Sequence, residues 1–151
     1  IETFGDGTSQ LVTITNNSII DPAYQGISID FRRSVQSSIT IKQNSIVYNT
    51  KSNTSRHGIT TYTAVPSGSQ NYYTLIENNS ITYNPSSIGG KGYDMSLMIQ
   101  VDKAIVNYNT INGYSGGYNY GVSNNGSKTA KVRFLGNTVR NAIWNLELFK
   151  G

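Results

Sequence analysis

An eight-residue pattern that occurs five times is the strongest constraint on the fold of this chain. Each copy contains two short runs of alternating apolar and polar residues, joined at an Asn that is followed by Ser or Thr and then by Ile or Val. The copies span Val12–Ile19, Ile39–Ile46, Thr74–Ile81, Ala104–Ile111 and Val132–Val139. The hinge residues are Asn17, Asn44, Asn79, Asn109 and Asn137, at intervals of 27, 35, 30 and 28 residues. A unit that recurs every 20 to 50 residues, roughly, is typical of solenoids.

The residues around the repeats favour strands throughout. Thr, Ile, Val and Tyr are common, only 13% of the 151 residues are charged, and apolar residues alternate with polar ones as in half-buried strands. We predict three strands per unit: one before the hinge Asn, one after it and one beyond a variable loop. The third kind begins at Gly26-Ile27, Gly58-Ile59 and Gly121-Val122. Residues 1–151 are therefore expected to form a single all-β domain without a helix or a linker.

Two local features are predicted from residue type. The segment Gly5–Ser9 is expected to form a turn before the first repeat, because it contains two Gly residues. Each hinge Asn is expected to adopt the left-handed backbone conformation, since Asn tolerates it better than other non-Gly residues.

Stacked coils would place the five hinge Asn residues above one another. If the coils lie about 4.8 Å apart, as strands do in a sheet, the Asn amides can hydrogen-bond from coil to coil, as in the Asn ladders of cross-β structures. A competing interpretation treats the Asn-x-Ser/Thr segments as glycosylation acceptors. Two of the four such segments, Asn16-Asn17-Ser18 and Asn78-Asn79-Ser80, overlap with the ladder, so we favour the ladder.

At these residues the chain resembles the right-handed parallel β-helix proteins of the pectin-lyase-like superfamily. The resemblance rests on the spacing of Ile14, Asn17 and Ile19, on its four later copies and on the Gly-Ile strands. It implies a right-handed, single-stranded parallel β-helix of about five coils with three short strands in each coil and a stacked Asn ladder. It also implies that a groove over the sheet of Gly-Ile strands binds polysaccharide.

Charge and cysteine content narrow the possible partners. The net charge is +4 and the isoelectric point is about 9.3, but the basic residues are scattered rather than gathered on one stripe, so a specific nucleic-acid interface is not expected. The positive balance indicates either a mildly basic surface or affinity for an anionic polymer. There is no Cys and no long apolar run, so we expect no disulfide, no metal site, no cofactor and no membrane insertion.

The two ends of the chain look like the interior of a solenoid. The sequence opens mid-pattern at Ile1 and ends in the strand-like segment Leu146–Gly151, whereas terminal coils usually carry polar caps. We therefore expect a fragment of a longer chain, or ends that another subunit covers.

The candidate ligand-binding residues lie on and around the Gly-Ile strands. If those strands stack in register, Asp30, Tyr62 and Gln100 form one outward column, and Arg32 and Asp102 belong to the next. Tyr faces suit sugar stacking, and Arg, Asp and Gln suit hydroxyl and carboxylate recognition. The alternative is that these residues are polar only because they face solvent, and that they bind no ligand. The full candidate set is Asp30, Arg32, Arg33, Arg56, His57, Tyr62, Tyr93, Asp94, Gln100 and Asp102.

No catalytic pattern stands out. A lyase of this fold would need clustered acidic metal ligands, yet Asp30 and Asp102 are expected two coils apart, or about 10 Å. A hydrolase would need adjacent carboxylates, and only eight acidic residues are present. His57 is the only His and is interpreted as a loop residue. Catalytic residues therefore cannot be named from the sequence.

The leading functional hypothesis is a β-helix segment of a surface protein, similar to a phage tail spike or appendage, that recognises cell-surface polysaccharide or teichoic acid. Such a protein would be extracellular, on a bacterial surface or a virion, and such spikes are often homotrimers. One alternative is the central part of a secreted polysaccharide lyase, hydrolase or epimerase. A second alternative is a structural spacer of an adhesin.

Overall fold

The chain is built from parallel β-strands. The computed structural model describes residues 1–50, 56–62, 72–84, 95–100, 103–113, 118–124, 131–141 and 147–150. The strands are β1 (Glu2–Thr15), β2 (Ser18–Ile20), β3 (Gln25–Lys42), β4 (Ser45–Tyr48), β5 (His57–Tyr62), β6 (Tyr72–Glu77), β7 (Ser80–Tyr83), β8 (Met95–Gln100), β9 (Lys103–Asn107), β10 (Thr110–Asn112), β11 (Tyr118–Asn124), β12 (Lys131–Leu135), β13 (Thr138–Arg140) and β14 (Glu147–Lys150). Within these described ranges there is no helix, and hence none that could cross a membrane.

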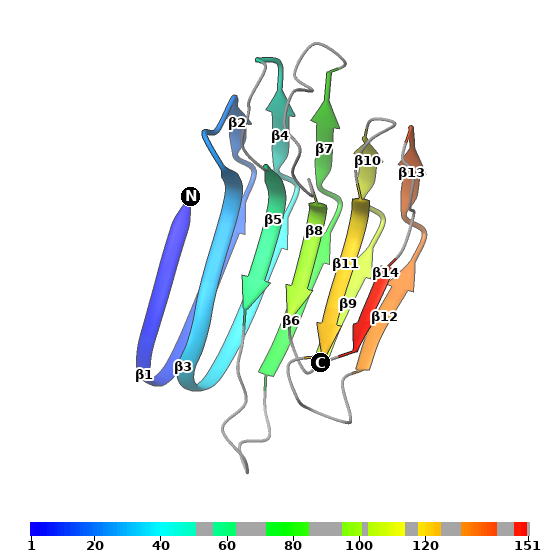
Figure 1. Cartoon of the computed structure of the whole chain (residues 1–151). Coiled ribbons are helices and arrows are strands. Elements are labelled where there is room, and N and C mark those ends of the chain that lie inside the picture. Colours follow the sequence, from blue (N-terminus) through cyan, green and yellow to red (C-terminus); the bar gives the residue numbers. More distant parts are fainter. Residues whose placement is uncertain are drawn as a thin grey trace.

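The strands form two sheets that present three faces (Figure 1). One sheet has the order β12-β9-β6-β3-β5-β8-β11-β14 with β1 beside β3, and the other has the order β13-β10-β7-β4-β2. Strand β3 belongs to two faces, because its first part pairs with β5 and its last part pairs with β6. We call these parts of the larger sheet the first and second faces, and the five-stranded sheet the third face. Each passage of the chain through all three is called a coil.

All described pairings between strands are parallel. Successive strands on one face come from successive coils, so the order along the stack follows the order along the chain. This arrangement confirms the predicted all-β class and is compatible with a parallel β-helix.

The predicted turn at Gly5–Ser9 is wrong. Strand β1 continues through this segment, and it stays paired with β3 from Asp6 opposite Arg33 to Ser9 opposite Gln36. The register shifts once, between Phe4 and Asp6. Both strands curve around the same corner in Figure 1. A bulge lets a strand bend without losing its neighbour, so the Gly residues serve a bent strand rather than a turn.

The core consists of stacked apolar side chains that follow the register of the strands. One column on the second face contains Ile14, Ile41, Ile76, Val106 and Phe134. A second column on the third face contains Ile19, Ile46, Ile81, Ile111 and Val139. The members in the middle coils are fully buried. Burial of these columns on both sides of the hinge explains why Ile or Val recurs at fixed distances from each hinge Asn.

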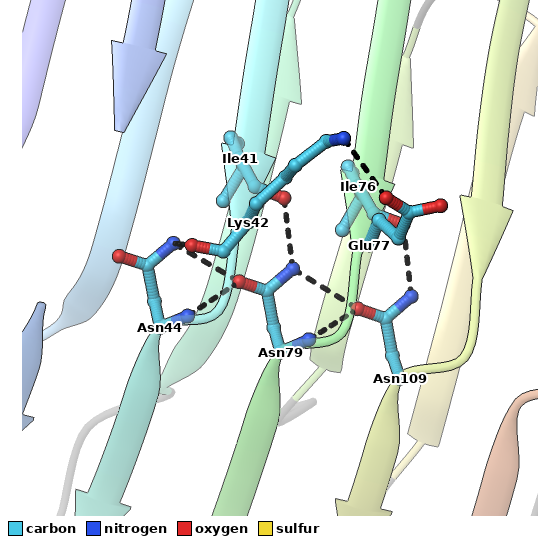
Figure 2. Close-up of polar contacts among 7 residues, drawn as sticks. All are labelled: Ile41, Lys42, Asn44, Ile76, Glu77, Asn79 and Asn109. Atoms are coloured by element: carbon cyan, nitrogen blue, oxygen red, sulfur yellow. Dashed lines mark hydrogen bonds and ion pairs between the residues drawn. The ribbon is translucent and has the colours of Figure 1, made fainter. Parts of the chain in front are cut away.

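The hinge Asn residues are hydrogen-bonded in series along the stack (Figure 2). The Nδ2 group of Asn44 donates to Oδ1 of Asn79 at 3.0 Å, and the backbone N–H of Asn44 donates to the same oxygen at 3.0 Å. Asn79 repeats both bonds to Asn109, at 3.0 and 2.9 Å. Its Nδ2 group also donates to the backbone oxygen of Ile41 at 3.0 Å. Each amide therefore joins neighbouring coils.

The left-handed residue at each hinge is the one before the ladder Asn, which corrects the prediction for the Asn itself. The residues with positive φ at this place are Asn16 (60°), Gln43 (56°), Asn78 (56°), Tyr108 (54°) and Gly136 (64°). All five are exposed, whereas the central ladder residues are buried. The left-handed residue makes the turn with its side chain outside, and this leaves the next amide free to point inward and form the ladder.

Glycine in the Gly-Ile motif is explained by close packing. A Cβ atom on Gly26 would lie 2.7 Å from Cγ2 of Ile46 and 2.8 Å from the backbone oxygen of Gly58. Gly26 and Gly58 occupy equivalent positions, since Ile27 pairs with Ile59. The third predicted copy is out of register, because Gly121 pairs with Met98, which pairs with Thr60 rather than with Gly58.

Candidate functional site

Three candidate residues occupy equivalent positions on neighbouring strands of the first face. Asp30 in β3 pairs with Tyr62 in β5, and Tyr62 pairs with Gln100 in β8. Phe4 in β1 pairs with Asp30 on the other side, and its side chain is 74% exposed. We call these four positions the first-face column. Neighbouring members lie about 4.8 Å apart, as parallel strands do.

The alternation in β3 directs Asp30 away from the core. Ile27, Ile29 and Phe31 are buried in the apolar cluster, so the residues between them face the other side of the sheet. Asp30 and Tyr62 are half-buried. This face therefore presents a carboxylate and a phenol at the same level along two adjacent strands.

The outer side of the first face is partly covered near its start. Ser28 and Thr60 are paired with each other, and both are buried although they alternate with core residues. The hydroxyl group of Thr60 donates to Oε1 of Gln25 at 3.1 Å. The accessible part of this face therefore begins at the first-face column.

Arg56, a candidate ligand-binding residue, is packed into the protein. Its side chain is buried, Nη1 donates to the backbone oxygen of Thr50 at 2.7 Å, and the guanidinium lies 5.2 Å from the centre of the Tyr48 ring. A cation above an aromatic face is a stabilising arrangement. The guanidinium is therefore used to hold the chain between β4 and β5.

Two Tyr rings beneath Arg56 belong to the core. The rings of Tyr48 and Tyr83 are stacked with their centres 4.6 Å apart and their planes 7° apart. The Tyr48 hydroxyl donates to the backbone oxygen of His57 at 2.6 Å. Tyr48 is the last residue of β4. The alternation Ile46-Val47-Tyr48 and Ile81-Thr82-Tyr83 already carried the signal for two inward-facing rings.

His57 is the first residue of β5 and is half-buried. It lies opposite Gln25, and its backbone N–H donates to the backbone oxygen of Tyr24 at 3.0 Å. It stands five positions before Tyr62 on the same strand, so it belongs to the beginning of the first face and not to the first-face column.

The remaining candidates can be placed only in part. Arg32 and Arg33 follow Asp30 within β3, and their side chains lie outside the described part of the structure. Only the strand position of Gln100 is described. Tyr93, Asp94 and Asp102 fall outside the described residues.

An acidic residue that the sequence did not single out organises the corner after β2. The Asp21 carboxylate accepts hydrogen bonds from the backbone N–H groups of Asn49, at 2.5 Å, and Thr50, at 2.8 Å. The hydrogen bond from the Thr50 N–H group is the largest cause that holds the pKa of Asp21 below its usual value, and the bond from Asn49 is the second. This carboxylate therefore fixes the start of a loop in the next coil.

The described residues of the first-face column offer hydrogen-bonding and packing groups. No group of three or more His, Cys, Asp or Glu side chains that could hold a metal ion occurs among them. In the first-face column, Asp30 is the one acidic residue at the four described positions. A carboxylate beside a phenol can accept hydroxyl hydrogen bonds and pack against an apolar ring face.

Comparison with known proteins returned no relative. The chain matches no family model, and no curated protein and no solved structure is significantly similar to it.

Proposed function

We propose that this chain is a segment of a surface fibre that binds a cell-surface polysaccharide or teichoic acid through the outer side of its first face. The parallel pairing and the three strands per coil support a single-stranded parallel β-helix resembling the pectin-lyase-like superfamily. We infer right-handed winding, because crossovers between parallel strands are right-handed in nearly all known cases.

The observation that carries this proposal is the register of the first-face column. Asp30, Tyr62 and the position of Gln100 repeat at one level on three adjacent strands. An extended glycan crossing those strands would meet a new side chain about every 4.8 Å. Tyr62 would pack against the apolar face of a sugar ring, and Asp30 would accept bonds from its hydroxyl groups.

The charge balance favours an anionic polymer. The net charge is +4, and Arg32 and Arg33 follow Asp30 in β3 with only Phe31 between them. Positive charge of this kind raises the local concentration of an acidic glycan or of the phosphates of teichoic acid. The proposed protein is accordingly extracellular, at a bacterial surface or on a virion.

We propose binding rather than cleavage because Asp30 has no second carboxyl group at the neighbouring described positions of the first-face column. Glycosidases generally use two carboxyl groups that flank the scissile bond. The described residues paired with Asp30 are Phe4 and Tyr62, neither of which can serve as that second group. No observation on the described residues favours the lyase, hydrolase or epimerase alternative.

The proposal is tested by affinity electrophoresis of the chain in gels that contain acidic or neutral bacterial polysaccharides or teichoic acid. We expect retardation by an anionic polymer, and a loss of affinity of about tenfold in Tyr62→Ala, which corresponds to about 1.4 kcal/mol. Tyr24→Ala is the matched control, because Tyr24 is an exposed Tyr outside the first face.

Circular dichroism of both variants checks that the strands are retained. Equal affinity of the Tyr62→Ala and Tyr24→Ala variants would place the binding site elsewhere. Failure of every polymer to retard the unmodified chain would overturn the function itself.

A further inference from the structure

The outer edge between the second and third faces carries one exposed residue from each coil, in regular register. Gln43, Asn78 and Tyr108 stand there in three successive coils, and the third-face strands that follow them, β4, β7 and β10, each have a paired strand on both sides. The backbone N–H of Gln43 donates to the backbone oxygen of Glu77 at 3.1 Å. That of Tyr108 donates to the backbone oxygen of Leu135 at 2.9 Å. Gln43, Asn78 and Tyr108 therefore follow one another about every 4.8 Å along the stack, and we call them the hinge column.

Tyr108 is held in a backbone conformation that its residue type disfavours. Its φ is 54°, in the left-handed region, where a bulky residue is an outlier. The equivalent positions in the other coils hold amide residues or Gly, and Asn and Gly tolerate this region best. Such an outlier costs free energy of folding, and residues of this kind cluster at functional sites. The turn itself gives no reason for a Tyr, so we looked for a reason in what its side chain does.

The Tyr108 ring lies against Gly136 of the next coil. A Cβ atom on Gly136 would lie 2.5 Å from both Cδ1 and Cε1 of the ring. The absence of a side chain at Gly136 therefore makes room for the ring. Tyr108 nevertheless remains 53% exposed. An aromatic ring that is supported and accessible in this way provides a surface on which the apolar face of a sugar ring can pack.

The groups beside this ring can both donate and accept hydrogen bonds. Gln43 and Asn78 are exposed and carry carboxamides, which have two N–H donors and one oxygen acceptor each. On the third-face side of the corner, the exposed residues Ser80 and Thr110 pair with each other in register and add hydroxyl groups. Such groups match the hydroxyl groups of a sugar, which also act as donors and acceptors.

Charge around the hinge column is balanced. Among the residues directly before and after its three members in the chain, Lys42 and Glu77 are the charged ones. Nζ of Lys42 lies 2.9 Å from Oε2 of Glu77, so the two charges compensate each other (Figure 2). The hinge column therefore offers no net charge that would attract an anionic polymer.

We propose that the hinge column is a second binding site, separate from the first-face column, and that its ligand is a neutral polysaccharide. One sugar unit packs on the Tyr108 ring, and the polymer runs along the stack so that further units bond to the carboxamides of Asn78 and Gln43. The strain at Tyr108 is retained because its ring is used for binding. This inference does not rest on the proposed binding of an anionic polymer, because the two sites use different residues.

Affinity electrophoresis in gels that contain dextran, galactomannan or hydroxyethyl cellulose tests the proposal. We expect at least one of these neutral polymers to retard the unmodified chain, and Tyr108→Asn to lower the affinity about tenfold through loss of ring stacking. Tyr108→Phe keeps the ring and should keep the affinity. Tyr24→Asn is the matched control, because Tyr24 is an exposed Tyr outside the hinge column.

Urea denaturation separates a binding role of Tyr108 from a structural one. Tyr108→Asn introduces the residue type that Asn16 and Asn78 supply at the equivalent positions, so the midpoint of unfolding should rise as strain is relieved. A lower midpoint would show that the ring stabilises the corner, and would overturn the inference. Unchanged affinity in Tyr108→Asn, an equal loss in Tyr108→Phe or Tyr24→Asn, or no retardation by any of the three polymers would overturn it as well. Failure in gels with anionic polymers alone would instead count against the function proposed for the first face.

Discussion

The two corners at which the chain enters and leaves the third face are built in different ways. At the hinge corner, between the second and third faces, an Asn amide makes the same bonds in coil after coil. At the opposite corner, which we call the variable corner, each coil uses different groups. Asp21 accepts from the next loop, Tyr48 donates to His57, and Asn84 donates to Oδ1 of Asn49.

The difference shows how a solenoid can combine constancy and variation. A ladder of identical amides works only if each coil presents the same residue at the same height, so the hinge tolerates little change. The variable corner makes no such demand, because the hydrogen bonds there use different groups in different coils. Insertions such as the one that lengthens the second interval to 35 residues therefore fall between the end of β4 and the start of β6.

The largest expected effect comes from breaking the ladder at its centre. Asn79 is 1% exposed, and Asn79→Ala would leave the N–H groups of Asn44, the carbonyl of Ile41 and Oδ1 of Asn109 without their amide partner. We expect a loss of about 3 kcal/mol or more in the free energy of unfolding, measured by urea denaturation. The control is Asn78→Gly, which keeps the left-handed turn and should be close to neutral.

A similar stability for both variants would mean that the hinge is held by the backbone turn and not by the amide ladder.

The next largest effect should come from the variable corner, where the first face begins. Gly26→Ala would place a Cβ atom 2.7 Å from Cγ2 of Ile46 and 2.8 Å from the backbone oxygen of Gly58. The buried backbone cannot move freely, so we expect a loss of about 1 to 3 kcal/mol, as for other overpacked cores. Thermal unfolding followed by circular dichroism measures the change.

An unchanged melting temperature for Gly26→Ala would show that the backbone at the variable corner can shift to make room for a methyl group. The contrast with the rigid hinge corner would then be larger.

A gain in stability is expected at Thr61 in β5. Its hydroxyl is buried and has no hydrogen-bond partner among the residues that the structure describes, whereas the hydroxyl of neighbouring Thr60 donates to Gln25. Thr61→Val should raise the free energy of unfolding by about 1 kcal/mol, because an unsatisfied buried hydroxyl is removed. Thr60→Val is the matched control and should be destabilising. The interpretation fails if the two substitutions change stability in the same direction.

The smallest effect concerns the pH dependence at the variable corner. The pKa of Asp21 is lowered in the folded chain by the N–H groups of Thr50 and Asn49, so its contribution to stability is present above its unfolded pKa. That contribution is lost as the pH falls through the lower, folded pKa. The free energy of unfolding, measured by urea denaturation from about pH 5 to pH 2, should therefore depend less on pH in Asp21→Asn than in the unmodified chain. A parallel pH dependence in the two proteins would rule out this role.

Much of the scaffold could be predicted because it repeats. Five copies of one pattern define the hinge, and the alternation around each copy predicts which Ile and Val residues stack inside. The spacing of Gly26-Ile27 and Gly58-Ile59 also predicted that Asp30 and Tyr62 share a level on neighbouring strands. These features depend on local periodicity and on the fixed spacing of strands, which a single sequence contains.

The sequence by itself determined the strand-forming repeat, the hinge Asn and the apolar columns, since each follows from a short-range pattern. The tertiary structure decided what neighbouring coils do to one another. It buried Arg56 over Tyr48, because a guanidinium that looks exposed in the sequence meets an aromatic ring only after the coils stack.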